Sequence, residues 1–109
     1  MSFRVVILDS AELDLKELRA YVLKNFSMET WHTSYTKIKE VIRNLKNFPQ
    51  AGSIPEEIEK LNLTQYRQVL SGLNRIIYEV RQDVIYIHIV ADTRRDMTTL
   101  LNRRLVRTV

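Results

Sequence analysis

The residues of this sequence best suited to binding or chemistry are arginines, and they gather toward its end. Every basic residue after Lys60 is an arginine, and residues 94–109 contain five arginines against one acidic residue, Asp96. A guanidinium group presents a rigid fork of hydrogen-bond donors that fits phosphate and carboxylate groups. We therefore expect this end of the molecule to meet an anionic partner, the alternative being an ordinary solvated surface.

Two further arginines, Arg67 and Arg75, come from neighbouring segments whose side chains alternate between two faces. If these segments pair as strands, both arginines are predicted to lie on one face of the sheet, near the arginines that follow the last strand. Such a cluster is suited to gripping a phosphodiester or a carboxylate-rich peptide. The alternative is that Arg67 and Arg75 pair with Glu79 or are simply solvated.

His88 is the one candidate for proton transfer, because imidazole titrates near neutrality. It stands among Ile87, Ile89 and Val90 in an expected central strand, which favours a packed histidine bonded to the backbone over a catalytic one. The sequence has no cysteine, and its two histidines are far apart, so we expect no metal site. It also lacks a glycine-rich phosphate loop, and we expect no cofactor.

The first half of the chain predicts a strand followed by two helices. Residues 3–8 are rich in β-branched residues and predict a short strand. Asp9 and Glu12 have the spacing of a capping box and mark a helix start, and Ser27 is the expected N-cap of a second helix. The short connection predicts an antiparallel helical hairpin. The second helix carries an apolar stripe of Trp31, Tyr35, Ile38, Ile42 and Leu45.

The second half changes to a period of two and predicts a three-stranded antiparallel meander over residues 66–70, 74–80 and 84–91. In the last of these strands Ile85, Ile87 and Ile89 are expected to share one face, and helices are expected to cover one side of the sheet. A short C-terminal helix follows, with Met97, Leu100, Leu101 and Leu105 as its apolar set. The fold class is therefore α+β: one domain over residues 1–109 built on a small curved sheet.

The second half also resembles a known family. Residues 66–80 are similar to the strand pair of the RelE/ParE toxin superfamily, in which a basic strand precedes an "R-I-x-Y-x-V" strand, here residues 75–80. Residues 87–97 resemble the last strand of that family and the "R-R-D" element after it, here residues 94–96. The N-terminal strand and helical hairpin fit as well, so the resemblance covers essentially the whole chain.

The resemblance implies the toxin of a type II toxin–antitoxin (plasmid stabilisation) module, which arrests growth until a cognate antitoxin neutralises it. RelE-like members cut messenger RNA on the ribosome with a basic cluster and a proton-moving Tyr or His near the C-terminus. ParE-like members lack that set and poison DNA gyrase. A ribonuclease would use Arg67, Arg75, Arg94, Arg95 and His88. Binding of the target or antitoxin would use Arg67, Arg75, Arg94, Arg95, Arg103 and Arg104.

The end of the chain favours the gyrase-poisoning branch, in which the protein is not an enzyme. Cleavage of RNA needs groups that take and give protons. Residues 96–109 contain neither Tyr nor His. Thr99 is a poor acid or base, and neighbouring arginines should lower the pKa of Asp96. The alternatives are a ribosome-dependent mRNA endoribonuclease and an inactive member that only binds nucleic acid.

The expected partners follow from the favoured branch. They are a cognate antitoxin and DNA gyrase, or the ribosome and mRNA in the ribonuclease alternative. The toxin is expected as a homodimer or as a heterotetramer with its antitoxin. The sequence has no apolar run of signal-peptide or membrane-spanning type, which predicts a cytoplasmic location and no membrane partner.

Overall fold

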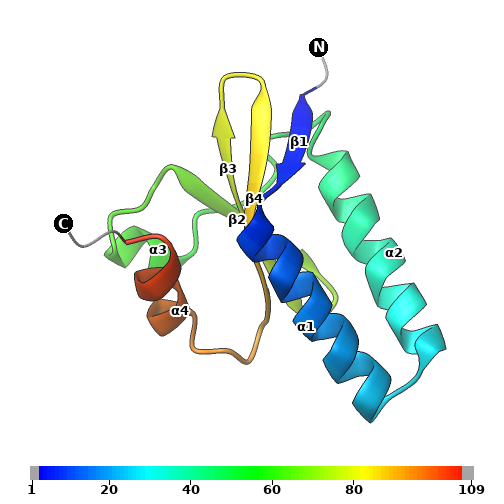
Figure 1. Cartoon of the computed structure of the whole chain (residues 1–109). Helices are drawn as coiled ribbons and strands as arrows, with labels where there is room; N and C mark the ends of the chain where they lie inside the picture. Colours follow the sequence, from blue (N-terminus) through cyan, green and yellow to red (C-terminus); the bar gives the residue numbers. More distant parts are fainter. Residues whose placement is uncertain (1–2, 107–109) are drawn as a thin grey trace.

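A four-stranded sheet with helices on both faces forms the molecule (Figure 1). The computed structural model describes residues 3–106. Arg107, the last of the five C-terminal arginines that we expect to meet an anionic partner, lies outside the described residues. The elements, in chain order, are β1 (Arg4–Ile7), α1 (Asp9–Asn25), α2 (Met28–Asn44), α3 (Glu56–Lys60), β2 (Tyr66–Ser71), β3 (Asn74–Arg81), β4 (Val84–Asp92) and α4 (Met97–Arg104).

The sheet has the strand order β1-β4-β3-β2. β2, β3 and β4 form the predicted antiparallel meander, and β1 pairs in parallel with β4 at its other edge. The strands end within one residue of the predicted positions, and the α+β class is confirmed. β4 is central, as its apolar composition indicated.

Helices cover both faces of this sheet, and the prediction of one covered face was wrong. The α1–α2 hairpin buries one apolar cluster, which includes Ile38, Ile85 and Ile87. α3 and α4 lie on the opposite face (Figure 1) and bury a second cluster around Ile77 and Leu101. The short C-terminal helix was predicted, but its packing against the sheet was not. The four apolar residues of this helix show that it has an apolar face, but not which surface that face covers.

The two long helices begin differently. The Ser27 side chain accepts a hydrogen bond from the Thr30 amide at 3.0 Å, so its predicted role as N-cap of α2 is confirmed. The capping box at Asp9 was wrong: Leu8 occupies the N-cap position of α1 and no side chain caps it. β1 leads directly into α1, with the Leu8 amide still bonded to the Ile87 carbonyl at 3.1 Å. Asp9 therefore lies in the first turn, where its negative charge interacts favourably with the positive N-terminal end of the helix dipole.

A β-bulge in β4 shifts the faces of the central strand. Tyr78 pairs with Ile87, whereas the preceding Ile77 pairs with Ile89, so His88 is the extra residue. Ile85 and Ile87 consequently join the cluster under α1 and α2, and Ile89 joins the cluster under α3 and α4. The prediction that Ile89 shares a face with Ile85 and Ile87 was wrong, because an inserted residue breaks the period of two.

An ion pair closes the edge of β4 just beyond the end of β1. The Asp14 carboxylate accepts a hydrogen bond from the Val90 amide at 3.0 Å. Arg104 of α4 donates to both Asp14 oxygens, at 3.0 and 3.1 Å, and to the His88 carbonyl at 2.7 Å. The side chains of Asp14 and Arg104 are only 13% and 18% exposed. The pair thus joins helices from opposite faces of the sheet and satisfies the bulged backbone.

Tyr78 fastens the long connection between α2 and α3 to the sheet. Its ring is fully buried, and its hydroxyl accepts from the Gly52 amide at 2.9 Å and donates to the Pro49 carbonyl at 2.8 Å. A side chain at Gly52 would come within 2.6 Å of that hydroxyl and of the Gln68 carbonyl. Only glycine fits this close approach of two chain segments.

The first prediction concerns this contact. Tyr78→Phe removes the hydroxyl and leaves two backbone groups without their partner, so the free energy of unfolding is expected to fall by about 1–3 kcal/mol. Tyr86→Phe is the matched control, since the Tyr86 hydroxyl makes no hydrogen bond within residues 3–106. Urea unfolding measures both, and equal midpoints for the two variants would contradict the assigned role.

The second prediction concerns the Asp14–Arg104 pair. Asp14→Ala leaves a nearly buried guanidinium without its counter-charge, which is expected to cost about 3–5 kcal/mol of stability. Glu56→Ala removes an exposed ion pair to Lys60 and should change stability by less than about 1 kcal/mol. Adding Arg104→Met to Asp14→Ala should recover part of the loss. A double variant as unstable as the sum of the two single changes would argue against the pair.

Candidate binding surface

Arg67 and Arg75 lie on opposite faces of the sheet, so the predicted cluster of the two does not form. Arg67 stands opposite Tyr78 in the β2–β3 register and shares its face. Arg75 precedes Tyr78 by an odd number of residues and therefore points to the other face. The Arg67 side chain donates to the Gly52 carbonyl at 2.8 Å, on the α2 side. Arg67 thus helps Tyr78 hold the α2–α3 connection.

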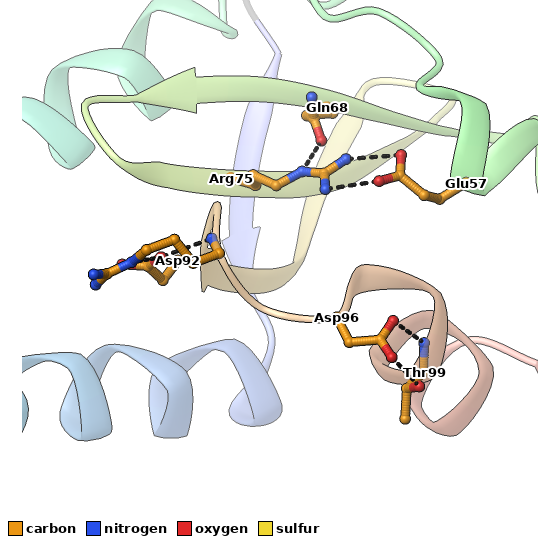
Figure 2. Close-up of polar contacts among 7 residues, drawn as sticks. Glu57, Gln68, Arg75, Asp92, Asp96 and Thr99 are labelled. Carbon is orange, nitrogen blue, oxygen red and sulfur yellow. Dashed lines mark hydrogen bonds and ion pairs between the residues drawn. The ribbon is translucent and has the colours of Figure 1, made fainter.

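Arg75 is held by two partners on the α3 face (Figure 2). Its two terminal nitrogens donate to the two carboxylate oxygens of Glu57, at 3.0 and 3.1 Å, and its Nε donates to Gln68. The Arg75 side chain is only 10% exposed. The hydrogen bonds from Arg75 lower the pKa of Glu57, which keeps the carboxylate charged. Arg75 is therefore paired, as the alternative interpretation expected, but with Glu57 and not with Glu79.

Arg94 and Arg95 lie on the loop between β4 and α4 and are exposed. Arg94 forms a bidentate pair with Asp92, at 2.9 and 3.0 Å, and these hydrogen bonds lower the pKa of Asp92. Within residues 3–106 the Arg95 side chain has no ion pair or hydrogen bond. Of the two arginines near the end of α4, Arg103 is exposed and Arg104 is committed to Asp14.

His88 is a packed residue, as the sequence favoured. Its Nε2 lies 3.0 Å from a Glu79 oxygen, and its ring meets the Tyr66 ring edge-on at 5.0 Å. Burial lowers the pKa of His88, so the imidazole is neutral at pH 7 and donates to the Glu79 carboxylate. The prediction that His88 bonds to the backbone was wrong. Its partner is the carboxylate of Glu79, which also pairs with Arg81 at 3.0 Å.

Asp96 and Thr99 are engaged with one another at the start of α4. Asp96 accepts from the Thr99 amide at 3.2 Å and from the Thr99 hydroxyl at 2.8 Å (Figure 2). These bonds lower the pKa of Asp96. The predicted direction of that shift is confirmed, but its chief cause is helix capping by Asp96 and not the neighbouring arginines. An ionised, capping carboxylate is unsuited to donating a proton.

Two adjoining hollows form a groove that the sequence did not indicate. One, of about 340 Å³, lies between α1 and the end of β4, and the other, of about 350 Å³, extends to the α1–α2 bend and the β2–β3 turn. We call both together the α1 groove. The residues that line both hollows are Leu18, Tyr21, Asn74, Asp92 and Arg94.

The rim of the α1 groove is apolar. Tyr21 is 47% exposed, Phe26 63% and Leu73 66%. α1 ends at Asn25, and Phe26, one turn after the buried Val22, turns outward beside Tyr21, with ring centroids 6.3 Å apart. Helical periodicity does not reveal such a residue, because its exposure depends on where the helix stops.

The comparisons with known proteins agree with this architecture. The family described as "ParE toxin of type II toxin-antitoxin system, parDE" matches residues 5–97. A chain of the "Chromosomal ParDE TA system from P. aeruginosa" has a similar fold, with a TM-score of 0.69 and 15% identity over 84% of this chain and 96% of that one. No curated protein matches the sequence.

None of the helices within residues 3–106 is long and apolar enough to cross a membrane. The family match spans the sheet, the α1–α2 hairpin and the start of α4. It includes the "R-I-x-Y-x-V" strand and the Arg94–Asp96 segment on which the sequence resemblance depended. The chain therefore belongs to the ParE toxin family of type II toxin–antitoxin systems.

Proposed function

We propose that this toxin arrests growth by binding and poisoning DNA gyrase, and that a cognate antitoxin neutralises it. The observation that best supports gyrase as the target is that Arg75 is not available to bind a phosphate. Its guanidinium is nearly buried and engaged by Glu57 and Gln68 through all three nitrogens. A cation that stabilises the charge developing on a phosphate during RNA cleavage must be free to meet it.

The other candidates for RNA chemistry support the same choice. Arg67 lies on the opposite face and is bonded to the Gly52 carbonyl. His88 is packed between Glu79 and Tyr66, and its lowered pKa disfavours the protonated form that a general acid needs. Asp96 and Thr99 are occupied with each other. Proton transfer and phosphate binding thus have no common centre among these residues, which disfavours the ribonuclease alternative.

A binding role suits the arginines that stay exposed. Within residues 3–106 the side chains of Arg95 and Arg103 have no ion pair or hydrogen bond, so both can meet carboxylates of a partner. The Arg94 side chain stays 72% exposed while it is paired with Asp92. Exposed arginines are frequent anchors in protein interfaces. We assign the contact with gyrase to this end of the molecule. The homodimer and the heterotetramer with antitoxin stay predictions of the sequence.

The third prediction tests the target. Purified protein is expected to inhibit supercoiling by gyrase or to raise gyrase-linked DNA breaks, and messages in a translating extract should stay intact. Arg95→Ala should weaken the effect on gyrase at least about tenfold, because one charged interaction of this kind is worth about 1.5–3 kcal/mol. Arg19→Ala removes an exposed arginine of α1 that lines neither hollow of the α1 groove, and it serves as the control. Codon-positioned cleavage of messages with gyrase unaffected would instead support the ribonuclease.

The fourth prediction separates the two targets with a single residue. His88→Gln keeps a hydrogen-bond donor for Glu79 but cannot carry a proton between groups. Under the proposed function, inhibition of gyrase and growth arrest should match those of the unmodified protein. A ribonuclease that depends on His88 would lose at least about a hundredfold in cleavage rate. Circular dichroism establishes that the variant is folded.

A further inference from the structure

We propose that β1 is a dimerisation edge, at which a second copy of this chain adds its own β1 in antiparallel orientation. The inference goes beyond the proposed function, because it concerns how two toxin molecules meet, whatever their target. The sheet has two edge strands, β1 and β2 (Figure 1). An edge strand presents a row of backbone N–H and C=O groups that can pair with another chain.

The edge at β2 is already covered, whereas the edge at β1 is open. Ser53, in the connection between α2 and α3, pairs with Gln68 on the outer side of β2 through two backbone hydrogen bonds, of 2.8 and 3.0 Å. The only such contact beside β1 comes just before the strand, where the Phe3 amide donates to the Lys46 carbonyl at 3.1 Å. Within residues 3–106 no strand lies beyond β1. β1 is therefore the edge that is left for a partner.

The backbone groups that face outward from β1 belong to Val5 and Ile7. The amides of Arg4 and Leu8 donate to carbonyls on the side of β4, at 2.9 and 3.1 Å, so the even-numbered residues of this segment bond toward β4. Because backbone groups alternate between the two edges of a strand, the N–H and C=O groups of Val5 and Ile7 point away from the sheet. The side chains of both pack against the cluster under α1 and α2, so their backbone is what they offer a partner.

These outward groups select one register for two copies of β1. With Val6 on a two-fold axis, Val5 lies opposite Ile7 of the second copy, and all of the outward groups on both chains find partners. Centring the pair on Val5 instead would require the Phe3 amide, which is already bonded. Centring it on Ile7 would require Asp9, which already belongs to α1.

Charges at the two ends of β1 complement each other in this register. Arg4 and Lys46 lie at its beginning and Asp9 follows its end, and all three are exposed. None of them has an ion pair within residues 3–106. The antiparallel pairing places Asp9 of the second copy opposite Phe3, beside both cations, and the two-fold axis repeats this contact. The net charge of +4 opposes association, but salt screens charges that lie far apart.

The side chains of β1 also suit an interface. The strand reads Arg-Val-Val-Ile, without proline and with a single charge, whereas edge strands that avoid pairing commonly carry both kinds of residue. Val6 is 37% exposed and would meet its own copy on the axis, where β-branched side chains pack well. Because two short strands bury little surface, we expect a weak dimer with a dissociation constant of about 1–100 μM.

The fifth prediction uses the absence of cysteine from this sequence. Val6→Cys places two thiols across the axis at a pair without backbone hydrogen bonds, where Cα atoms lie about 4.5 Å apart, within reach of a disulfide. Mild oxidation of the full-length variant at about 100 μM is expected to link most molecules as dimers. Leu70→Cys is the matched control, since Leu70 is 57% exposed on the covered edge strand, and it should stay largely monomeric.

A second test removes one outward N–H group. Val5→Pro leaves the bonds to β4 in place, because proline is tolerated in an edge strand where its nitrogen faces solvent. Sedimentation velocity should show that the dissociation constant of the dimer rises at least about tenfold in Val5→Pro. Val5→Ala loses the same side chain but keeps the N–H group, and it should change the constant by less than about threefold. Circular dichroism establishes that both variants are folded.

The outcomes decide what occupies this edge. Val6→Cys dimers, together with loss of the dimer in Val5→Pro only, would support the proposal. An unmodified toxin that is monomeric at about 1 mM, or a dimer that Val5→Pro leaves intact, would overturn it. So would protection of the Val5 and Ile7 amides from hydrogen exchange only after antitoxin is added. None of these measurements depends on growth arrest or gyrase, so the dimer and the proposed function can fail separately.

Discussion

The structure depends on how the bulged edge of β4 is satisfied. β1 ends at Ile7, and beyond it β4 continues with a bulge at His88 that has no neighbouring strand on that side. Asp14 and Arg104 supply the missing hydrogen bonds from side chains. Because these two residues come from helices on opposite faces, one nearly buried ion pair fixes α1, β4 and α4 together. The α1 groove and the loop that carries Arg94 and Arg95 owe their relative position to it.

Pairing of arginines with carboxylates, as in the Asp14–Arg104 pair, also explains why an arginine-rich sequence presents a limited cationic surface. Arg75 and Arg104 are each held by a carboxylate in a bidentate pair, and Arg94 is paired with Asp92. Guanidinium groups suit such pairs because their fork matches two carboxylate oxygens. Composition counts all arginines alike, whereas binding depends on those that stay free. Of the arginines after Lys60, those whose side chains have no ion pair or hydrogen bond within the described chain, Arg95 and Arg103, lie toward the α4 end, which favours docking over phosphate chemistry.

Sequence reasoning was accurate where the determining interactions are local. The Ser27 cap and the strands of the meander depend on neighbouring residues, and the structure has them almost where they were predicted. The face of Ile89 was wrong because one inserted residue leaves the alternating pattern visibly intact while reversing the faces of the later side chains. Glu57, the partner of Arg75, belongs to a helix 18 residues away in sequence, and no periodicity connects the two.

The α1 groove and the exposed arginines after β4 belong to one continuous surface. Arg94 and Arg95, which we assign to the contact with gyrase, also line the α1 groove. A partner seated in the groove would therefore cover the same cations that the target needs. The Asp14–Arg104 pair holds α1 and α4 against β4, so it keeps the groove wall and the segment with Arg94 and Arg95 in place before any partner arrives. A surface that is ordered in advance loses less conformational entropy on binding.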